Sequence, residues 1–417
     1  MQACLAALIL SAPLPAQEAL VSSPRAEADW PGWRGPRADG HSTESGLPTT
    51  WTAESVAWKT ALPGRGQSSP VIWGDRIFLT AALENGRRRV LFSVDRNTGK
   101  IEWEKVAWTG EPEPSHAMNG WASATCATDG ERVYAFFGRG GLHAYALDGA
   151  HAWSADLGSF EGPWGTAACP VVVGERVVQN CDAEKDARLV ALDRKTGKTV
   201  WTAKREDHRG WSTPVLVRAE GRDELVLNGH TGIAAYDPAT GNPLWSVRCD
   251  KGRGTPTVTP ADGRVYVTNG LAGAGLYAVR PGGSGDVTAT HRLWLAARNG
   301  RDLPSPIVIG KTVLVQSLRP NVLTAYDAES GKELWTERIP GQVSASPISF
   351  GGLALFIQES GETVVVDPKA EPRIVARNAV GAAPGELFRA TITPSDGQLF
   401  IRSDRTLYCV GKRKAAR

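Results

Sequence analysis

The chain has 417 residues, 41% of them hydrophobic, and its 47 Lys and Arg against 44 Asp and Glu give a formal net charge of +3. This length allows two or three ordinary domains or one large repeat array. The near balance of charge excludes the concentrated basic face typical of a nucleic-acid-binding protein. The 46 Gly and 27 Pro indicate many turns.

Residues 1–16 predict a secretory signal peptide cleaved near Ala16. MQACLAALILSAPLPAQ holds an apolar stretch that is too short to span a bilayer and ends in small residues and Pro. No Lys or Arg precedes the stretch, and Leu14 is large for its position, so a frayed apolar N-terminus is the alternative. We expect an exported protein, periplasmic or extracellular, with only indirect association with a membrane.

Five cysteines remain after this segment, scattered and without a CxxC pattern: Cys126, Cys169, Cys181, Cys249 and Cys409. The spacing indicates neither a zinc ribbon nor a c-type haem site. We expect buried free thiols, because a chain with a sizeable core does not need disulfides.

The segment 17–53 contains WPGWRGP at 30–36. Trp30 and Trp33 stand beside Pro and Gly, which disfavours a helix. We expect a structural strap across the side of the following domain; the alternative is an element that docks a partner.

Residues 54–411 are organised by a repeat. A phrase with Asp eight residues before Trp occurs at 95–103 (DRNTGKIEW), 193–201 (DRKTGKTVW), 237–245 (DPATGNPLW) and 327–335 (DAESGKELW). The tryptophans at the phrase position recur at steps of 41 to 50 residues: Trp58, Trp103, Trp153, Trp201, Trp245, Trp294 and Trp335. Val375 occupies the next slot, so eight units are present.

Each unit reads as four short strands. In the unit ending at Trp103, a segment of small residues and Pro (68–72) is followed by a two-residue turn, an alternating strand (76–80), a third strand (91–95) and the Trp-bearing strand. Eight such units predict an all-β fold, an eight-bladed β-propeller of four-stranded antiparallel blades. A run of β-sandwiches is the alternative, but it would not keep one register.

The two ends of the repeat predict ring closure. The last unit supplies three strands, within 389–410, and VAWKTAL (56–62) is a fourth strand without its first three. We expect the N-terminal strand to complete the last blade, which removes a free sheet edge. Residues 412–417 form a short basic tail.

The repeated phrase is interpreted as scaffold. Its Asp accepts backbone N–H groups in a turn, its Gly permits positive φ, and its Trp packs on the neighbouring blade. The turn residues are Asp95, Asp193, Asp237 and Asp327 with Gly99, Gly197, Gly241 and Gly331.

The pattern A-x-D-x-x-T-G-x-x-x-W, as in ALDRKTGKTVW (191–201) and AYDPATGNPLW (235–245), resembles the pyrroloquinoline quinone (PQQ) propeller repeat. The resemblance covers nearly all of 54–411. The family includes quinoprotein dehydrogenases and propellers without quinone, among them the propeller lipoprotein of the outer-membrane β-barrel assembly machinery. The segment 30–51 also resembles the head of secreted bacterial PQQ-like repeat proteins.

The resemblance implies how a quinoprotein would hold its cofactor: between a Trp and two adjacent cysteines, beside Ca²⁺ bound by Glu, Asn and Asp. No two cysteines are adjacent here, and that ligand set has no match. PQQ is therefore not supported, and we expect no cofactor, no metal and no catalytic residues.

The loops that join each fourth strand to the next blade are rich in cationic and aromatic residues. They should converge on one face of the propeller as a funnel. Its predicted residues are Arg65, His116, Asn119, Trp121, Trp164, His208, Arg209, Trp211, Lys251, Arg253, Arg298, Arg301, Arg338 and Arg389. Loop-base packing, with the arginines paired to nearby carboxylates, is the structural alternative. The run Arg87, Arg88 and Arg89 is expected in an exposed loop on the same face.

We therefore expect an exported, monomeric, non-enzymatic propeller that acts as a binding or assembly scaffold in the cell envelope. Its funnel would take a protein partner or a small anionic or sugar-like ligand, and no nucleic acid. The alternative is a quinoprotein oxidoreductase, PQQ-dependent dehydrogenase-like, with a degenerate site.

Overall fold

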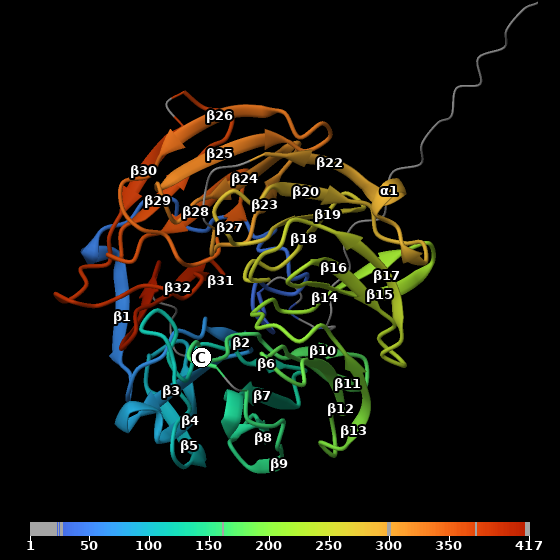
Figure 1. The fold of residues 1–417 in the computed structure, drawn as a ribbon. Coiled ribbons are helices and arrows are strands. Elements are labelled where there is room, and N and C mark those ends of the chain that lie inside the picture. Colours follow the sequence, from blue (N-terminus) through green and yellow to red (C-terminus); the bar gives the residue numbers. More distant parts are fainter. Residues whose placement is uncertain are drawn as a thin grey trace, which may run out of the picture.

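The computed structural model describes residues 23, 25, 28–160, 162–297, 302–371 and 373–412. Within them, eight antiparallel sheets stand in a ring around a central axis (Figure 1). The predicted signal peptide (1–16), Arg298, Arg301 and residues 413–417 of the predicted tail lie outside these ranges. No helix in the described part of the chain is long and apolar enough to cross a membrane.

The eight blades follow one another in chain order, each with its first strand next to the axis and its fourth at the rim. Blades 1 to 4 consist of β2 (Val71–Trp73), β3 (Arg76–Leu83), β4 (Arg88–Asp95) and β5 (Ile101–Thr109); β6 (Ala127–Thr128), β7 (Arg132–Phe136), β8 (Leu142–Ala146) and β9 (His151–Ala155); β10 (Val171–Val173), β11 (Arg176–Cys181), β12 (Arg188–Asp193) and β13 (Thr199–Lys204); and β14 (Val215–Ala219), β15 (Arg222–Asn228), β16 (Gly232–Tyr236) and β17 (Pro243–Arg248).

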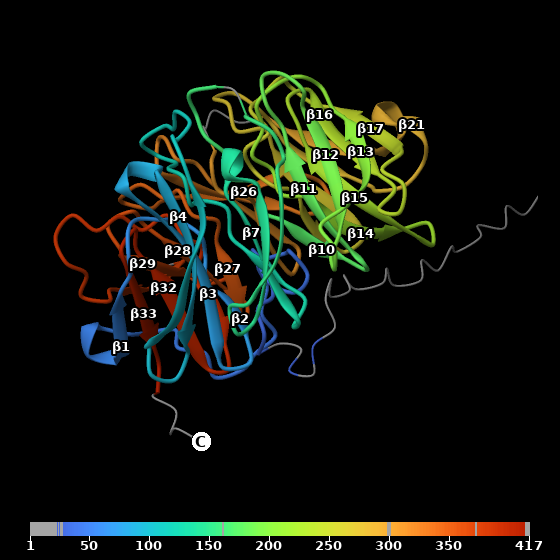
Figure 2. The same ribbon diagram turned by 90° about the horizontal axis from the view of Figure 1, so that it is seen from below.

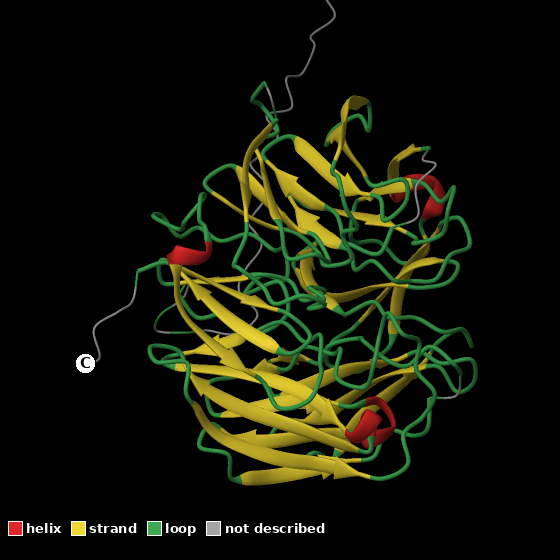
Figure 3. Ribbon diagram, turned by 90° about the vertical axis from the view of Figure 1, so that its left-hand side faces the viewer, coloured by secondary structure: helices red, strands yellow, loops and turns green. Residues whose placement is uncertain are grey.

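Blades 5 to 8 consist of β18 (Thr259–Ala261), β19 (Arg264–Thr268), β20 (Leu276–Val279) and β22 (Arg292–Ala296); β23 (Ile307–Ile309), β24 (Thr312–Gln316), β25 (Val322–Asp327) and β26 (Glu333–Arg338); β27 (Ile348–Phe350), β28 (Leu353–Ile357), β29 (Thr363–Val366) and β30 (Ile374–Asn378); and β31 (Thr393–Ser395), β32 (Gln398–Arg402), β33 (Thr406–Val410) and β1 (Val56–Ala61). The helices of the described residues are short (Figure 3): three 3-10 turns, η1 (Ala53–Ser55), η2 (Glu84–Gly86) and η3 (Gly138–Gly140), and one α-helix, α1 (Thr288–His291).

The prediction of ring closure by the N-terminal strand is confirmed. β1 pairs antiparallel with β33, from Val56 opposite Val410 to Ala61 opposite Thr406. Figures 1 and 2 both place β1 beside the C-terminal strands of blade 8. The pairing covers the edge of β33 that would otherwise stay open to another strand.

The repeated tryptophans join neighbouring blades, as predicted. Six indole N–H groups donate to a backbone carbonyl in the turn between the third and fourth strands of the next blade. The pairs are Trp58 with Arg96, Trp103 with Leu147, Trp153 with Arg194, Trp201 with Pro238, Trp294 with Ala328, and Trp335 with Pro368, at 3.0 to 3.2 Å. The phrase therefore links an Asp turn in one blade to a Trp in the preceding one.

The turn residues act as predicted, and the glycine has a second role. Oδ1 of Asp193 accepts the N–H groups of Lys195 (3.1 Å) and Thr196 (2.8 Å). Gly197 has φ of +71°, a conformation that favours glycine. A Cβ at Gly197 would also lie 2.6 Å from the ring of Trp153, so the glycine makes room for the joint.

The joint after Trp245 is different. Its indole donates to Oε2 of Glu224, at 2.7 Å, in its own blade. The next blade carries an insertion between its third and fourth strands, and part of it, β21 (Gly285–Asp286), pairs in parallel with β17. The insertion therefore covers the rim of blade 4 and takes the place of the usual turn.

The joint after blade 7, where the Trp is missing, is filled from elsewhere in the chain. The predicted slot residue Val375 is exposed, and Ala376 stands opposite Val365 in the register of the missing Trp. Trp51 of the N-terminal segment is buried in a cluster with Ile348, Val365 and Tyr408 of blades 7 and 8. Its backbone N–H donates to Asn378 Oδ1 at 2.9 Å.

The segment around WPGWRGP is a strap, but it crosses the end of the central channel rather than the side of the propeller. Trp30 bridges to Ile72 of blade 1. Arg34 is fully buried and donates to Thr259 Oγ1 of blade 5 and to the Pro306 carbonyl beside blade 6, both at 2.8 Å. Burial lowers the pKa of Arg34 to about 10. Further contacts to blades 7 and 8 tie the ring together at the face that carries the first-to-second-strand turns.

Candidate functional site

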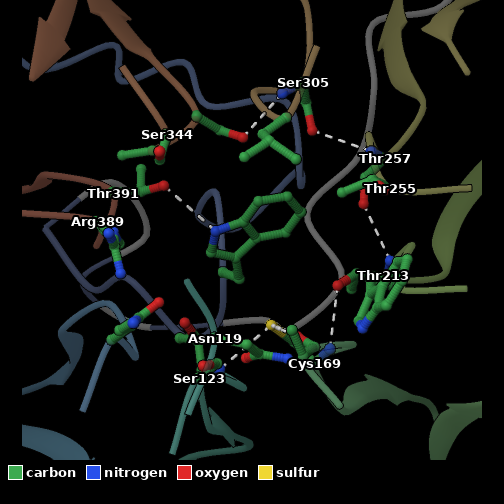
Figure 4. Close-up of a pocket in the computed structure, with 18 of the residues that line it drawn as sticks. Asn119, Ser123, Cys169, Thr213, Thr255, Thr257, Ser305, Ser344, Arg389 and Thr391 are labelled. Carbon is green, nitrogen blue, oxygen red and sulfur yellow. Dashed lines mark hydrogen bonds between the residues drawn. The ribbon is translucent and has the colours of Figure 1, made fainter. Parts of the chain in front are cut away.

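The opposite face, here called the loop face, carries the loops that enter each first strand. The hollows on this face include a central cavity and a side groove. The central cavity, of about 230 Å³, lies on the axis, and the side groove, of about 630 Å³, lies among the loops of blades 8, 1 and 2. Figure 4 shows the central cavity with polar residues from successive blades around it.

A belt of hydrogen bonds between blades surrounds the central cavity. Before seven of the eight first strands, a backbone N–H donates to a hydroxyl or thiol of the next blade, at 2.8 to 3.3 Å. In ring order the residues are Thr391, Ser69, Thr125, Cys169, Thr213, Thr257, Ser305 and Ser346. The small residue before each first strand, which stands beside a Pro in six of the eight repeats, is therefore a ring contact and lines the cavity at the same time.

The strap reaches this belt. Trp33 lines the cavity, and its indole N–H donates to Thr391 Oγ1 at 3.3 Å. Since the rest of the strap lies at the other face, Trp33 enters the channel from that side. The N-terminal segment thus provides one wall of a cavity that otherwise belongs to the repeats.

Six of the predicted funnel residues line the central cavity: His116, Asn119, Trp164, Trp211, Arg253 and Arg389. The ring of Trp164 is the centre of this group. His116 lies 5.1 Å from it, and the guanidinium of Arg253 lies 5.8 Å from its centroid. The Trp164 carbonyl accepts from Asn119 Nδ2 at 2.9 Å.

Arg389 is paired, as the structural alternative expected, although with a different acid. Its Nε and Nη2 donate to both carboxylate oxygens of Glu359, at 2.9 and 3.1 Å, and Nη1 donates to the Ala117 carbonyl. A bidentate pair of this kind fixes the orientation of the guanidinium.

The remaining predicted residues that face a hollow line the side groove. Arg65 and Trp121 line it together with His116, Asn119 and Arg389. The Trp121 indole donates to the Glu113 carbonyl at 2.7 Å. The Arg65 side chain is 74% exposed. The three loop tryptophans therefore do not form one funnel: two line the cavity and Trp121 lines the groove.

Four other predicted residues line neither hollow. His208 stacks on His230 at 3.7 Å, Arg209 forms an ion pair with Glu184, and Lys251 and Arg338 are exposed. Of the arginine run, Arg87 is exposed as predicted, whereas Arg88 begins β4 and is half-buried. Arg89 is buried and pairs with Glu113, because it points inward from β4 under the ring of Trp108.

The sequence did not predict that Trp33, Ser123 and the belt residues line the cavity. The motif of small residue and Pro was recognised as the start of the first strand. A small Ser, Thr or Cys recurs at this position in all eight blades, next to the innermost strand, and that recurrence was the available signal for a lining role.

Fold and site together define an eight-bladed PQQ-like repeat propeller with a polar-walled axial cavity. The family model described as "Outer membrane protein assembly factor BamB" matches residues 43–179, 115–337 and 291–379. The chain belongs to this family.

Individual relatives agree with this assignment. The chain is 25% identical over 350 residues to outer membrane protein assembly factor BamB of Burkholderia pseudomallei, covering 77% of this chain and 80% of the relative. Among solved structures, BamB from Moraxella catarrhalis aligns with a TM-score of 0.62 and 17% identity over 87% of this chain and 98% of that one. A europium-containing methanol dehydrogenase aligns with a TM-score of 0.71 and 11% identity over 93% and 98% of the two chains. At these identities the two structures show the fold alone.

The residues of the cavity do not fit the quinone site that the resemblance to quinoproteins implies. Its described lining contains one cysteine, Cys169, and no Asp or Glu. Within the described ranges, no group of three His, Cys, Asp or Glu is placed to hold a metal ion. A paired-cysteine platform, a carboxylate base and carboxylate calcium ligands are thus missing from the part of the cavity that the structure describes.

Proposed function

We propose that this protein is an exported, non-enzymatic propeller that acts as a binding or assembly scaffold in the cell envelope, in the periplasm of its cell. Membership of the BamB family supports an assembly role, since the curated relative is named an outer membrane protein assembly factor. The scaffold would work as a monomeric ring, attached to the membrane only through its partners. The partner would be a protein bound on the loop face.

The side groove is the observation that carries this proposal. It combines apolar side chains, Leu83, Trp121 and Leu387, with the charged residues Arg65 and Glu84 at its edge. An apolar centre with a polar rim and an exposed Arg is typical of protein–protein interfaces. The loops of three blades build it, and hydrogen bonds hold each of them: Arg65 N–H donates to the Ala82 carbonyl, the Trp121 indole to the Glu113 carbonyl, and Leu387 N–H to Asp404 Oδ1. Such bonds reduce the order that has to be gained on binding.

The test is photo-crosslinking in the native envelope. A photoreactive residue at Arg65 should crosslink to one specific envelope protein, and Trp121→Ala should abolish that product. The matched control is the same residue at Asp75, which is exposed in a first-to-second-strand turn on the opposite face. A crosslink of equal yield from Asp75, or one that survives Trp121→Ala, would refute the groove as the docking site.

The quinoprotein alternative is favoured by the likeness of fold to the dehydrogenase and by a match of 36% identity over 101 residues to a quinoprotein alcohol dehydrogenase of Pseudomonas putida. Adding PQQ and Ca²⁺ to the purified protein and following quinone absorbance and dye-coupled alcohol oxidation tests it. We expect neither a spectral shift nor turnover, and saturable binding with turnover would overturn the scaffold proposal.

A further inference from the structure

Two polar atoms in the central cavity are buried and have no hydrogen-bond partner in the described protein. They are Oδ1 of Asn119 and Oγ of Ser123. Asn119 and Ser123 lie on the same side of the cavity (Figure 4). Leaving a buried polar atom unpaired costs free energy, so such atoms call for a ligand or water. The other unpaired buried atoms of the described residues lie outside the lining of this cavity.

The remaining walls offer aromatic faces and hydroxyl groups. Trp33, Trp164 and Trp211 line the cavity from three different parts of the chain. The negative face of an indole attracts polarised C–H groups. Around them, the serine and threonine hydroxyls of the belt accept backbone N–H groups, and a hydroxyl that accepts in this way still has an O–H to donate.

The size and the charge of the cavity further restrict the kind of ligand that fits it. A volume of about 230 Å³ equals the space of about eight waters, which suits one six-membered ring. The described lining has no carboxylate, and the guanidinium of Arg389 is already paired with Glu359. A small ligand with several hydroxyls and an apolar face therefore fits the walls.

We propose that the central cavity binds a single sugar ring, either as a free monosaccharide or as the end of a glycan. The indoles contact the C–H faces of the ring, and Asn119 Oδ1 and Ser123 Oγ pair with its hydroxyls. Trp33 makes the N-terminal strap a part of the site. This site shares His116, Asn119 and Arg389 with the side groove, but it does not depend on the scaffold role.

The experiment is calorimetric titration of the full chain, supported by melting temperatures, with methyl glucoside, methyl galactoside, N-acetylglucosamine and glucuronate at millimolar concentration. At least one probe should bind saturably and raise the melting temperature. The disaccharide of the probe that binds separates the two sources: weaker binding indicates a free monosaccharide, and equal or tighter binding indicates a glycan end. No saturable binding of any probe would overturn the proposal.

The decisive variant is Ser123→Ala. It removes an unpaired hydroxyl, so the free protein should melt at the same or a higher temperature, while sugar affinity falls by up to about tenfold. Trp33→Phe should also weaken binding. Trp121→Phe is the control, because Trp121 lines the groove alone, and it should leave sugar binding unchanged. Binding that is insensitive to both Ser123→Ala and Trp33→Phe would place the sugar elsewhere and refute the site.

Discussion

Trp201→Ala tests whether the repeated tryptophans stabilise the joints between blades. The side chain is 8% exposed and packs among Leu189, Leu225 and Tyr236 of blades 3 and 4. A buried indole of this kind removes roughly 150–250 Å² from water. At about 25 cal/mol per Å² this gives about 4–6 kcal/mol for the whole side chain, of which the alanine keeps a part.

The indole also donates to the Pro238 carbonyl at 3.1 Å, a bond worth about 1 kcal/mol. We therefore expect Trp201→Ala to lower the free energy of unfolding by about 3–5 kcal/mol, in line with buried Trp→Ala substitutions. Urea denaturation followed by both far-UV circular dichroism and fluorescence measures it and tests whether unfolding is two-state.

The control is Val200→Ala on the same strand. Val200 is 46% exposed, so this change should stay within about 0.5 kcal/mol. If Trp201→Ala also costs less than about 1 kcal/mol, the indole does not stabilise the joint and the account of the repeat is wrong.

Two further predictions concern the turns. Gly241→Ala should lower the stability of the folded protein by clearly more than Gly174→Ala. Both glycines have positive φ, which costs an alanine about 1–2 kcal/mol. Only at Gly241 would the new Cβ also lie 2.5 Å from a ring, that of Trp201. Equal losses in melting temperature would show that the ring can move aside. Hydrogen bonds from Thr196 and Lys195 in the turn lower the pKa of Asp193. The carboxylate therefore contributes fully to stability above the ordinary Asp pKa of about 3.9, and this contribution is lost as the pH falls through the lowered pKa. The melting-temperature gap between the wild type and Asp193→Ala should therefore be constant near neutrality and narrow below about pH 4, whereas a gap that widens on acidification would contradict this reasoning.

The candidate site was predicted only in part from the sequence. The rule that fourth-to-first-strand loops share one face brought His116, Trp164 and Arg389 to the same cavity. It could not say which way each side chain turns once there: His208 turns to stack on His230, and Trp121 turns toward the groove. Those directions depend on the conformations of the loops, which differ in length and do not repeat along the sequence.

The sequence by itself determined the propeller, because its signals are local and repeated: alternating strands, an Asp–Gly turn and a Trp at a fixed distance. It also determined the ring closure, since the first and last units are incomplete in complementary ways. Only the tertiary structure decided what the non-repeating residues do. Trp51 fills the joint that lacks the repeated Trp, and Trp33 enters the axial cavity. Both contacts join the N-terminal segment to residues more than three hundred positions away, and no pattern along the chain encodes a contact between one unrepeated segment and a surface built by the whole ring.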